Sequence, residues 1–188
     1  MFPNPQDALS LPPRPSLERY RKLAKELVKA CKSDDDNAIG DWAEQWIRAL
    51  AKATGAKSTP DSLAAVDRST NAVESFARRK LPGTDSGSDA ANKNCALSSA
   101  QFVIARSHGF ESWPKFAKHL ESLARKTSSV SRFEAAADAI VVGDLAELKR
   151  LLREDPALVR ATSTRDHCAT LLHYVAANGV ENYRQKTP

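Results

Sequence analysis

The chain has 188 residues, of which 41% are hydrophobic and 27% charged. This composition is typical of one globular domain or two small ones, and it excludes a disordered chain. No apolar run approaches the roughly 20 residues of a membrane-spanning helix, which excludes an integral membrane protein. The net charge is +5, and residues 91–130 hold six basic and two acidic side chains. The sequence therefore predicts no membrane partner and one mildly basic stretch.

The three cysteines are Cys31, Cys95 and Cys168, and none belongs to a Cys-x-x-Cys pair. An odd number without such pairs disfavours a disulfide framework and a cysteine-rich zinc site. The N-terminus also lacks the basic and apolar regions of a signal peptide. We therefore expect free thiols and a cytoplasmic location, where thiols stay reduced.

Half of the ten prolines fall in the first fifteen residues, so residues 1–15 are predicted to be a flexible tail. From Ser16 onward apolar residues recur every three or four positions, which is the spacing of one helix face. Ser16 and the pair Thr59-Pro60 suit helix starts, and Gly55 suits a helix end. The pattern predicts three helices, over about residues 17–31, 39–53 and 60–77.

Small and polar residues at 82–94 are predicted to form a flexible linker. Two more amphipathic helices are expected over about 97–107 and 112–125, with a turn at Gly109 between them. No segment shows the sustained alternation of a half-buried strand. The chain is therefore predicted to be all-α, beginning with a bundle-like helical domain over residues 16–125.

Two stretches near the C-terminus carry a recognisable pattern. Residues 143–152 read GDLAELKRLL, and residues 170–179 read TLLHYVAANG. They resemble the second helix and the Thr-Pro-Leu-His opening of an ankyrin repeat. Gly143 and Gly179 are 36 positions apart, close to the ankyrin period of about 33 residues. Residues 131–188 thus look like the start of an ankyrin-repeat solenoid, with one repeat and an incomplete second one.

The resemblance implies a role for each matched residue. Alanines let paired helices approach closely, glycines end the first helix of each pair, and leucines form a stripe that packs on the neighbouring repeat. The Thr and His of the opening segment hydrogen-bond to hold the turn. The residues expected to build the repeats are Gly143, Leu145, Leu148, Leu151, Leu152, Thr170, Leu172, His173, Ala176, Ala177 and Gly179.

Ankyrin repeats bind proteins through loop tips and one helix face. The resemblance therefore implies a non-catalytic scaffold or adaptor that needs no cofactor and binds a protein partner, whose identity the sequence does not specify. The outward-facing positions expected to contact that partner are Thr164, Arg165, Asp166, Tyr174 and Asn178.

The second repeat departs from the ankyrin pattern. Leu171 replaces the usual proline, and Glu181 and Arg184 stand where the first repeat has leucines of its second helix. We therefore expect the chain to be an N-terminal piece of a longer array, frayed after Gly179. The side chains expected to be partly uncovered are Leu172, Val175 and Ala176.

The helical region before residue 125 also resembles a segment that precedes ankyrin repeats in some bacterial proteins. The resemblance rests on residues 100–106 (AQFVIAR) and 108–116 (HGFESWPKF). It implies no activity.

An alternative function is nucleic-acid binding by a helix-turn-helix in residues 97–125, with Lys115, Lys118 and His119 in its second helix. That helix lacks the Arg, Asn and Gln side chains that read base edges, and Pro114 occupies its first turn. Nucleic acid is therefore the less favoured partner.

The group formed by His167, Cys168 and His173 is the one cluster that suggests a metal site or a nucleophile. It offers too few ligands for zinc, and adjacent loop residues rarely hold a thiolate against an imidazole. The sequence also lacks phosphate-cradling glycine motifs. It predicts no metal, no catalytic residue and no enzyme.

Overall fold

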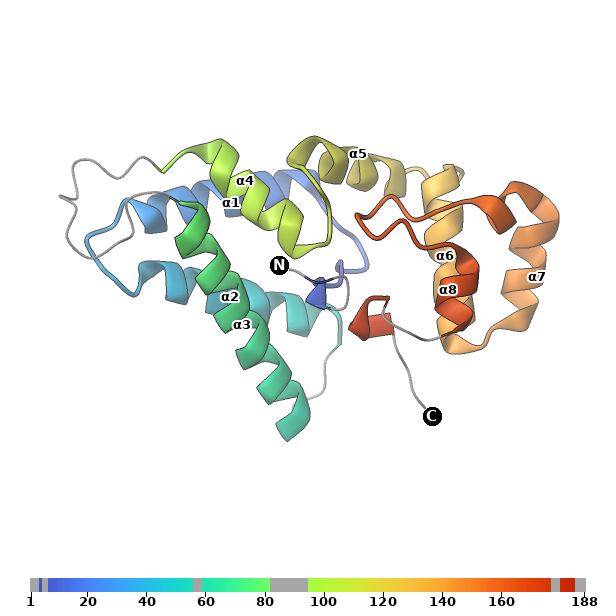
Figure 1. The fold of residues 1–188 in the computed structure, drawn as a ribbon, viewed down its shortest axis with the longest axis horizontal. Helices are drawn as coiled ribbons and strands as arrows, with labels where there is room; N and C mark the ends of the chain where they lie inside the picture. The colour runs from blue at the N-terminus through green and yellow to red at the C-terminus, as the bar shows by residue number, and fades with distance from the viewer. Residues whose placement is uncertain (1–3, 5–6, 56–58, 82–94, 177–179, 185–188) are drawn as a thin grey trace. The chain divides into compact units, whose positions relative to one another are not determined.

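The structure is a computed structural model that describes residues 4, 7–55, 59–81, 95–176 and 180–184. Their regular structure is helical apart from an isolated antiparallel bridge between Thr162 and Thr170 (Figure 1). The predicted all-α class is confirmed for this part of the chain. None of the helices within it has the length and apolar character needed to cross a membrane. The predicted linker at 82–94 lies outside the described residues.

The chain divides into two compact units. The N-terminal unit comprises Ser10–His108, and the C-terminal unit comprises Gly109–Pro188 together with Pro3–Leu9. Ala8 and Leu9 are buried in the C-terminal unit. The predicted flexible tail is therefore packed at these two residues, because they are apolar despite the prolines around them.

The boundary between the units differs from the predicted one at residue 125. Helix α5 (Trp113–Leu123) packs against α6 (Ser129–Val142), so it belongs to the C-terminal unit. The intervening polar residues form a structured turn, in which Ser128 Oγ donates to the Ser122 carbonyl at 2.7 Å. The prediction was wrong because polar composition alone does not separate such a turn from a linker.

The N-terminal unit holds α1 (Leu17–Cys31), α2 (Ala38–Ala53), α3 (Pro60–Lys80) and α4 (Leu97–Ser107). Two predicted helix starts are confirmed. Ser16 Oγ accepts from the Arg19 amide at 3.4 Å, and Thr59 Oγ1 accepts from the Ser62 amide at 3.3 Å. Helices α1 and α2 show strongly one-sided patterns because their apolar residues face a shared core.

Large apolar side chains fill the core of the N-terminal unit. Leu27, Val73 and Ile104 are fully buried, and Trp46 lies against the buried ring of His108 with 5.7 Å between centroids. Trp42 is buried as well, and its indole Nε1 donates to the Leu23 carbonyl at 3.3 Å. This core follows from the apolar periodicity of the sequence.

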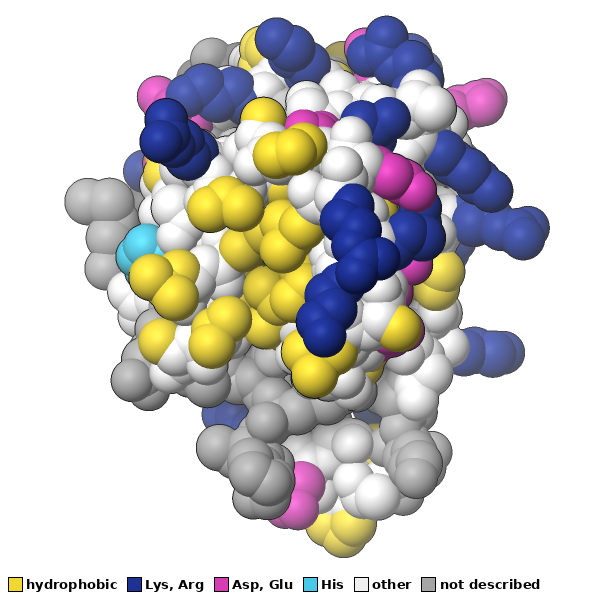
Figure 2. Space-filling view, turned by 90° about the vertical axis from the view of Figure 1, so that its right-hand side faces the viewer, with side chains coloured by type: hydrophobic (Ala, Val, Ile, Leu, Met, Phe, Trp, Pro, Cys, Tyr) yellow, Lys and Arg dark blue, Asp and Glu magenta, His cyan; other side chains and the backbone are white. Residues whose placement is uncertain are grey.

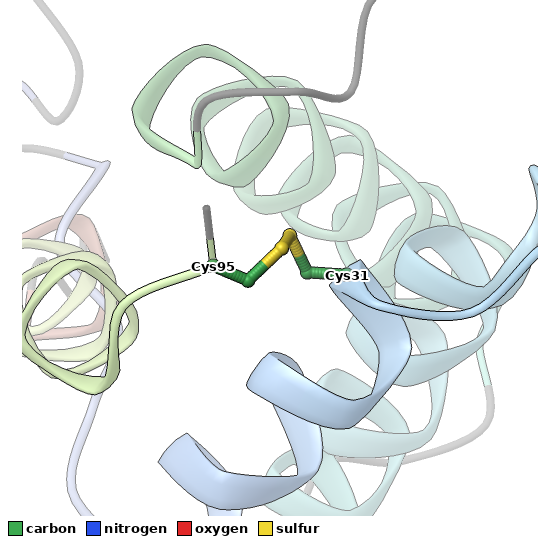
Figure 3. Close-up of a disulfide and its surroundings, with 2 residues drawn as sticks. All are labelled: Cys31 and Cys95. Carbon is green, nitrogen blue, oxygen red and sulfur yellow. A yellow bond between two sulfur atoms is a disulfide. The ribbon is translucent and has the colours of Figure 1, made fainter. Parts of the chain in front are cut away.

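A disulfide joins Cys31, the last residue of α1, to Cys95, just before α4 (Figure 3). The prediction of free thiols was therefore wrong for these two cysteines. They are 64 positions apart, and the packing of α1 against α4 brings their Cα atoms to 6.1 Å. A single sequence does not reveal such a pair, because the contact depends on helix packing rather than on spacing.

The C-terminal unit continues from α5 and α6 through α7 (Leu145–Glu154), a 3₁₀ turn η3 (Pro156–Arg160), α8 (Leu171–Val175) and a 3₁₀ turn η4 (Asn182–Arg184). Helices α7 and α8 both pack against α6. Its core is formed by Phe133, Ala136, Ala137, Leu151, Leu158, Ala169, Leu171, Tyr174 and Val180.

Candidate functional site

The residues matched to the ankyrin pattern take up helix ends and packing positions. Gly143 ends α6 with a left-handed φ of 75°, a conformation that glycine adopts without strain. Asp144 then caps α7 by accepting from the Glu147 amide at 2.9 Å. Of the predicted leucine stripe, Leu151 is buried and Leu148 and Leu152 are half-buried.

The start of α8 is held as the sequence pattern predicts. The Thr170 amide donates to His173 Nδ1 at 3.2 Å, and the His173 amide donates to the Thr170 carbonyl at 3.1 Å. This exchange satisfies backbone groups that a helix start otherwise leaves unpaired. Ala177 and Gly179 lie outside the described residues.

Residues 162–170 form a short hairpin between η3 and α8, here called the finger. The Thr162–Thr170 bridge closes it, and the Ser163 amide donates to the Ala169 carbonyl at 2.8 Å. At its far end the Cys168 amide donates to the Arg165 carbonyl at 3.0 Å, and Cys168 adopts a φ of 49°. The finger is therefore a defined turn that presents some side chains outward and others inward.

Arg165 is the inward anchor of the finger. It was expected to face a partner, but it is only 2% exposed. Its Nε lies 2.6 Å from Glu181 Oε1, and its guanidinium lies over the Phe110 ring at 5.5 Å. The prediction was wrong because it inferred exposure from the loop position. The guanidinium is instead buried in ion pairs with carboxylates that are far away in the sequence.

Glu181 and Arg184 belong to the same buried charge network. Arg184 Nη1 lies 3.0 Å from Glu181 Oε2, and its Nη2 lies 2.7 Å from Glu134 Oε2 and 2.9 Å from Asp138 Oδ1. The network thus links α6, the finger and η4. The segment 180–184 was expected to fray, but these ion pairs hold it, and Val180, Glu181 and Arg184 are buried.

Electrostatics in this network favour ionised carboxylates. Burial alone would raise the pKa of Glu181, but Arg165 and His167 outweigh it and lower that pKa to about 2. The pKa of Glu134 is also lowered, since Arg165 and Arg184 outweigh its burial. Two arginines therefore balance two buried glutamates, as low-dielectric surroundings require.

The outward side chains of the finger are Thr164 and Asp166, which are exposed as predicted. Thr164 Oγ1 lies 2.7 Å from Nδ1 of the buried His119, and the Asp166 amide donates to the Gly109 carbonyl at 2.8 Å. The hydrogen bond to His119 thus holds the Thr164 side chain, and the bond to Gly109 holds the backbone at Asp166. Of the other expected contact residues, Tyr174 is buried against Phe133, which corrects that prediction, and Asn178 lies outside the described residues.

A cavity of about 320 Å³ lies between α5 and the finger, and we call it the finger pocket. Lys118 borders it on α5, and Thr164, Asp166 and Cys168 border it on the finger. Cys168 is a free, exposed cysteine. The pocket thus offers charges of both signs and a thiol on one rim.

The two histidines of the His167–Cys168–His173 group are both engaged in hydrogen bonds within the C-terminal unit. His167 Nε2 lies 3.2 Å from Glu181 Oε1, and its Nδ1 accepts from the Ala169 amide at 3.0 Å. His173 is engaged at the start of α8, as described above. Among the residues that the structure describes, no three His, Cys, Asp or Glu side chains are grouped to hold a metal ion.

The structure also bears on the residues proposed to contact nucleic acid. Helices α4 and α5 fall in different units, and Lys115 is paired with Glu111. His119 is 1% exposed, so it offers almost no surface to a phosphate, and its burial lowers its pKa to about 4. Lys118 remains as an exposed cation on α5.

Several large apolar side chains on α7 and α8 are exposed. Leu145 is 64% exposed at the start of α7, and Leu172 is 74% exposed on α8. Val142 and Val175 are exposed too, and Ala176 with them, so the prediction of uncovered side chains on α8 is confirmed. Figure 2 shows hydrophobic side chains gathered in one area of the face seen from the α7 side, with Lys and Arg above this area and to its right.

Sequence reasoning missed the buried network. Its one visible signal is the pair of carboxylates, Glu134 and Asp138, among the apolar and alanine residues of α6 (FEAAADAI). Such a charge inside an apolar pattern indicates a buried partner.

The chain matches no protein-family model, no curated protein and no solved structure.

Proposed function

We propose that the C-terminal unit is an ankyrin-like module that binds a protein partner, and that the chain acts as a non-catalytic adaptor. The proposal rests on the sequence resemblance. It is supported by the succession of α6, α7, finger and α8, with a glycine ending α6 and a Thr–His pair starting α8.

The finger carries the proposal most directly. A buried ion pair to Glu181 fixes Arg165, while Thr164 and Asp166 on either side of it are exposed. Because the buried Arg165 side chain already holds the turn in place, the turn loses little conformational entropy when a partner binds. This favours binding through its exposed side chains. A fixed loop on a helical scaffold is typical of binding modules.

Cys168 allows this function to be tested on the full chain. A benzophenone maleimide attached to Cys168 places a photo-crosslinker on the rim of the finger pocket. A matched control, Cys168→Ser with Arg68→Cys, carries the same group on the exposed side of α3. We expect one protein from the source cells to crosslink through Cys168 and not through position 68. Equal labelling from both positions, or none from Cys168, would contradict the proposal.

Nucleic-acid binding by residues 97–125 remains the alternative, favoured by the excess of four positive charges over residues 91–130. Retention on DNA that falls steeply with salt and is lost in Lys118→Glu would support it. We expect weak retention that this substitution leaves nearly unchanged.

The cytoplasmic location stays a prediction from the sequence. The Cys31–Cys95 disulfide counts against it, because disulfides persist mainly in oxidising compartments. Alkylation of thiols in intact cells, followed by mass spectrometry of Cys31, distinguishes the two states.

A further inference from the structure

The exposed and half-buried leucines of α7 form one stripe along the helix. At 100° per residue, Leu145, Leu148 and Leu152 fall within one narrow sector, and the buried Leu151 lies on its inner side. Lys149 and Arg153 border the stripe on its solvent side. Both are exposed, and neither makes an ion pair within the described residues.

The carboxylates of α7 do not offset these two cations. Glu147 and Glu154 lie on the opposite side of the helix, where both pair with Arg150 at 2.6 Å. Arg160, also exposed, follows the exposed Val159 in η3. The apolar stripe therefore has an uncompensated basic border.

Helix α8 adds a second apolar edge. Leu172 and Val175 are three positions apart, which places them on one side of the helix, while Leu171 and Tyr174 face the core. Leu148 and Leu152 pack against the same core cluster, which includes Leu171 of α8, and α7 and α8 each pack against α6 (Figure 1). We call this surface, made by Val142, Leu145, Leu148, Leu152, Leu172 and Val175, the α7–α8 face.

We propose that the α7–α8 face binds an amphipathic helix of a partner protein, with leucine-like residues on one side and acidic residues along its flank. The inference rests on the proposed protein-binding function and names the kind of partner. A helix is the element that fits, since it satisfies its own backbone hydrogen bonds while its apolar side packs against the exposed apolar side chains of α7 and α8.

Charge decides between possible occupants. Two copies of this chain facing each other through the α7–α8 face would bring Lys149 and Arg153 of each copy together without counter-charges. An acidic flank instead pairs with both cations. The apolar centre also offers nothing to a phosphate backbone.

A synthetic peptide of about 15 residues tests the inference on the full chain. The probe carries leucines at helical spacing with glutamates on the flank, and a matched peptide has lysines in place of the glutamates. Fluorescence anisotropy measures both affinities at low and high salt. We expect the acidic peptide to bind at least roughly tenfold more tightly than the basic one, with the difference shrinking at high salt.

Three variants locate the peptide. Leu172→Gln removes apolar contact from an exposed position, and we expect binding roughly tenfold weaker. Lys149→Glu should weaken binding about threefold and reduce its salt dependence. Lys52→Glu makes the same charge change at an exposed position of α2 in the other unit and should leave binding unchanged.

Four results would overturn the proposal: no binding of the acidic peptide, equal binding of both peptides, equal effects of Lys149→Glu and Lys52→Glu, or reversible dimerisation of the chain abolished by Leu172→Gln. The last would assign the face to a second copy. Crosslinking from Cys168 tests the protein-binding function independently, so the failure of the peptide leaves that result standing.

Discussion

The two units of this chain are stabilised in different ways. The N-terminal unit combines a core of large apolar and aromatic side chains with a disulfide between α1 and α4. The C-terminal unit has an alanine-rich central helix, α6, and a buried network of two arginines and two glutamates. Apolar packing is tolerant of detail, whereas a buried ion network requires particular partners. The second kind of interaction gives the finger a fixed anchor.

The largest expected effect comes from the core of the C-terminal unit. Leu151→Asp buries a carboxylate without a partner, and we expect a loss of about 5 kcal/mol or more, enough to unfold this unit. Amide hydrogen exchange reports the two units separately. Leu145→Asp is the matched control, because it makes the same change at an exposed position of the same helix. Equal destabilisation by both variants would contradict the described packing of α7.

The Cys31–Cys95 disulfide is expected to stabilise the N-terminal unit. Replacing Cys31 and Cys95 by serine removes a link across 64 positions, which is expected to cost about 4 kcal/mol by the loss of loop constraint in the unfolded chain. Exchange should quicken in α1–α4 and stay unchanged in α5–α8. A Cys168→Ser control leaves the bond intact. Unchanged exchange in the double variant would show that the disulfide does not form.

The ion network provides the next comparison. Glu181→Gln keeps the shape of the side chain but leaves Arg165 with less counter-charge, and we expect a loss of about 4 kcal/mol in the C-terminal unit. Glu147→Gln breaks an exposed pair with Arg150 and should leave stability unchanged. If urea denaturation shows the same loss of unfolding free energy for Glu181→Gln and Glu147→Gln, the proposed role of the buried network is wrong.

Acid should weaken the C-terminal unit in two steps. The pKa of His119 is about 4, below its usual 6.5, so the unfolded chain takes up this proton first. The free energy of unfolding should therefore fall by roughly 3 kcal/mol as the pH drops from about 6.5 to 4. The pKa of Glu181 is about 2, below its usual 4.5, so its stabilisation is lost as the pH falls further. Urea denaturation at several pH values measures both steps. His119→Gln should remove the loss of unfolding free energy between about pH 6.5 and 4 and leave the loss at lower pH.

The sequence predicts the fold class and most helices, because Ser16, Thr59 and Gly143 mark helix ends and apolar residues recur at helical spacing. It also predicts the exposure of Leu172. It does not predict that Arg165 is buried, since Glu134 and Glu181 are 31 residues before it and 16 after it. Likewise, the Cys31–Cys95 pair depends on how α1 meets α4. Interactions between segments far apart in the sequence leave almost no local pattern.

The most direct test of the central claim compares amide hydrogen exchange of the full chain alone and bound to the protein captured through Cys168. The account predicts new protection in α7, the finger and α8, with α1–α4 unchanged. Protection confined to α1–α4 would contradict the assignment of binding to the C-terminal unit.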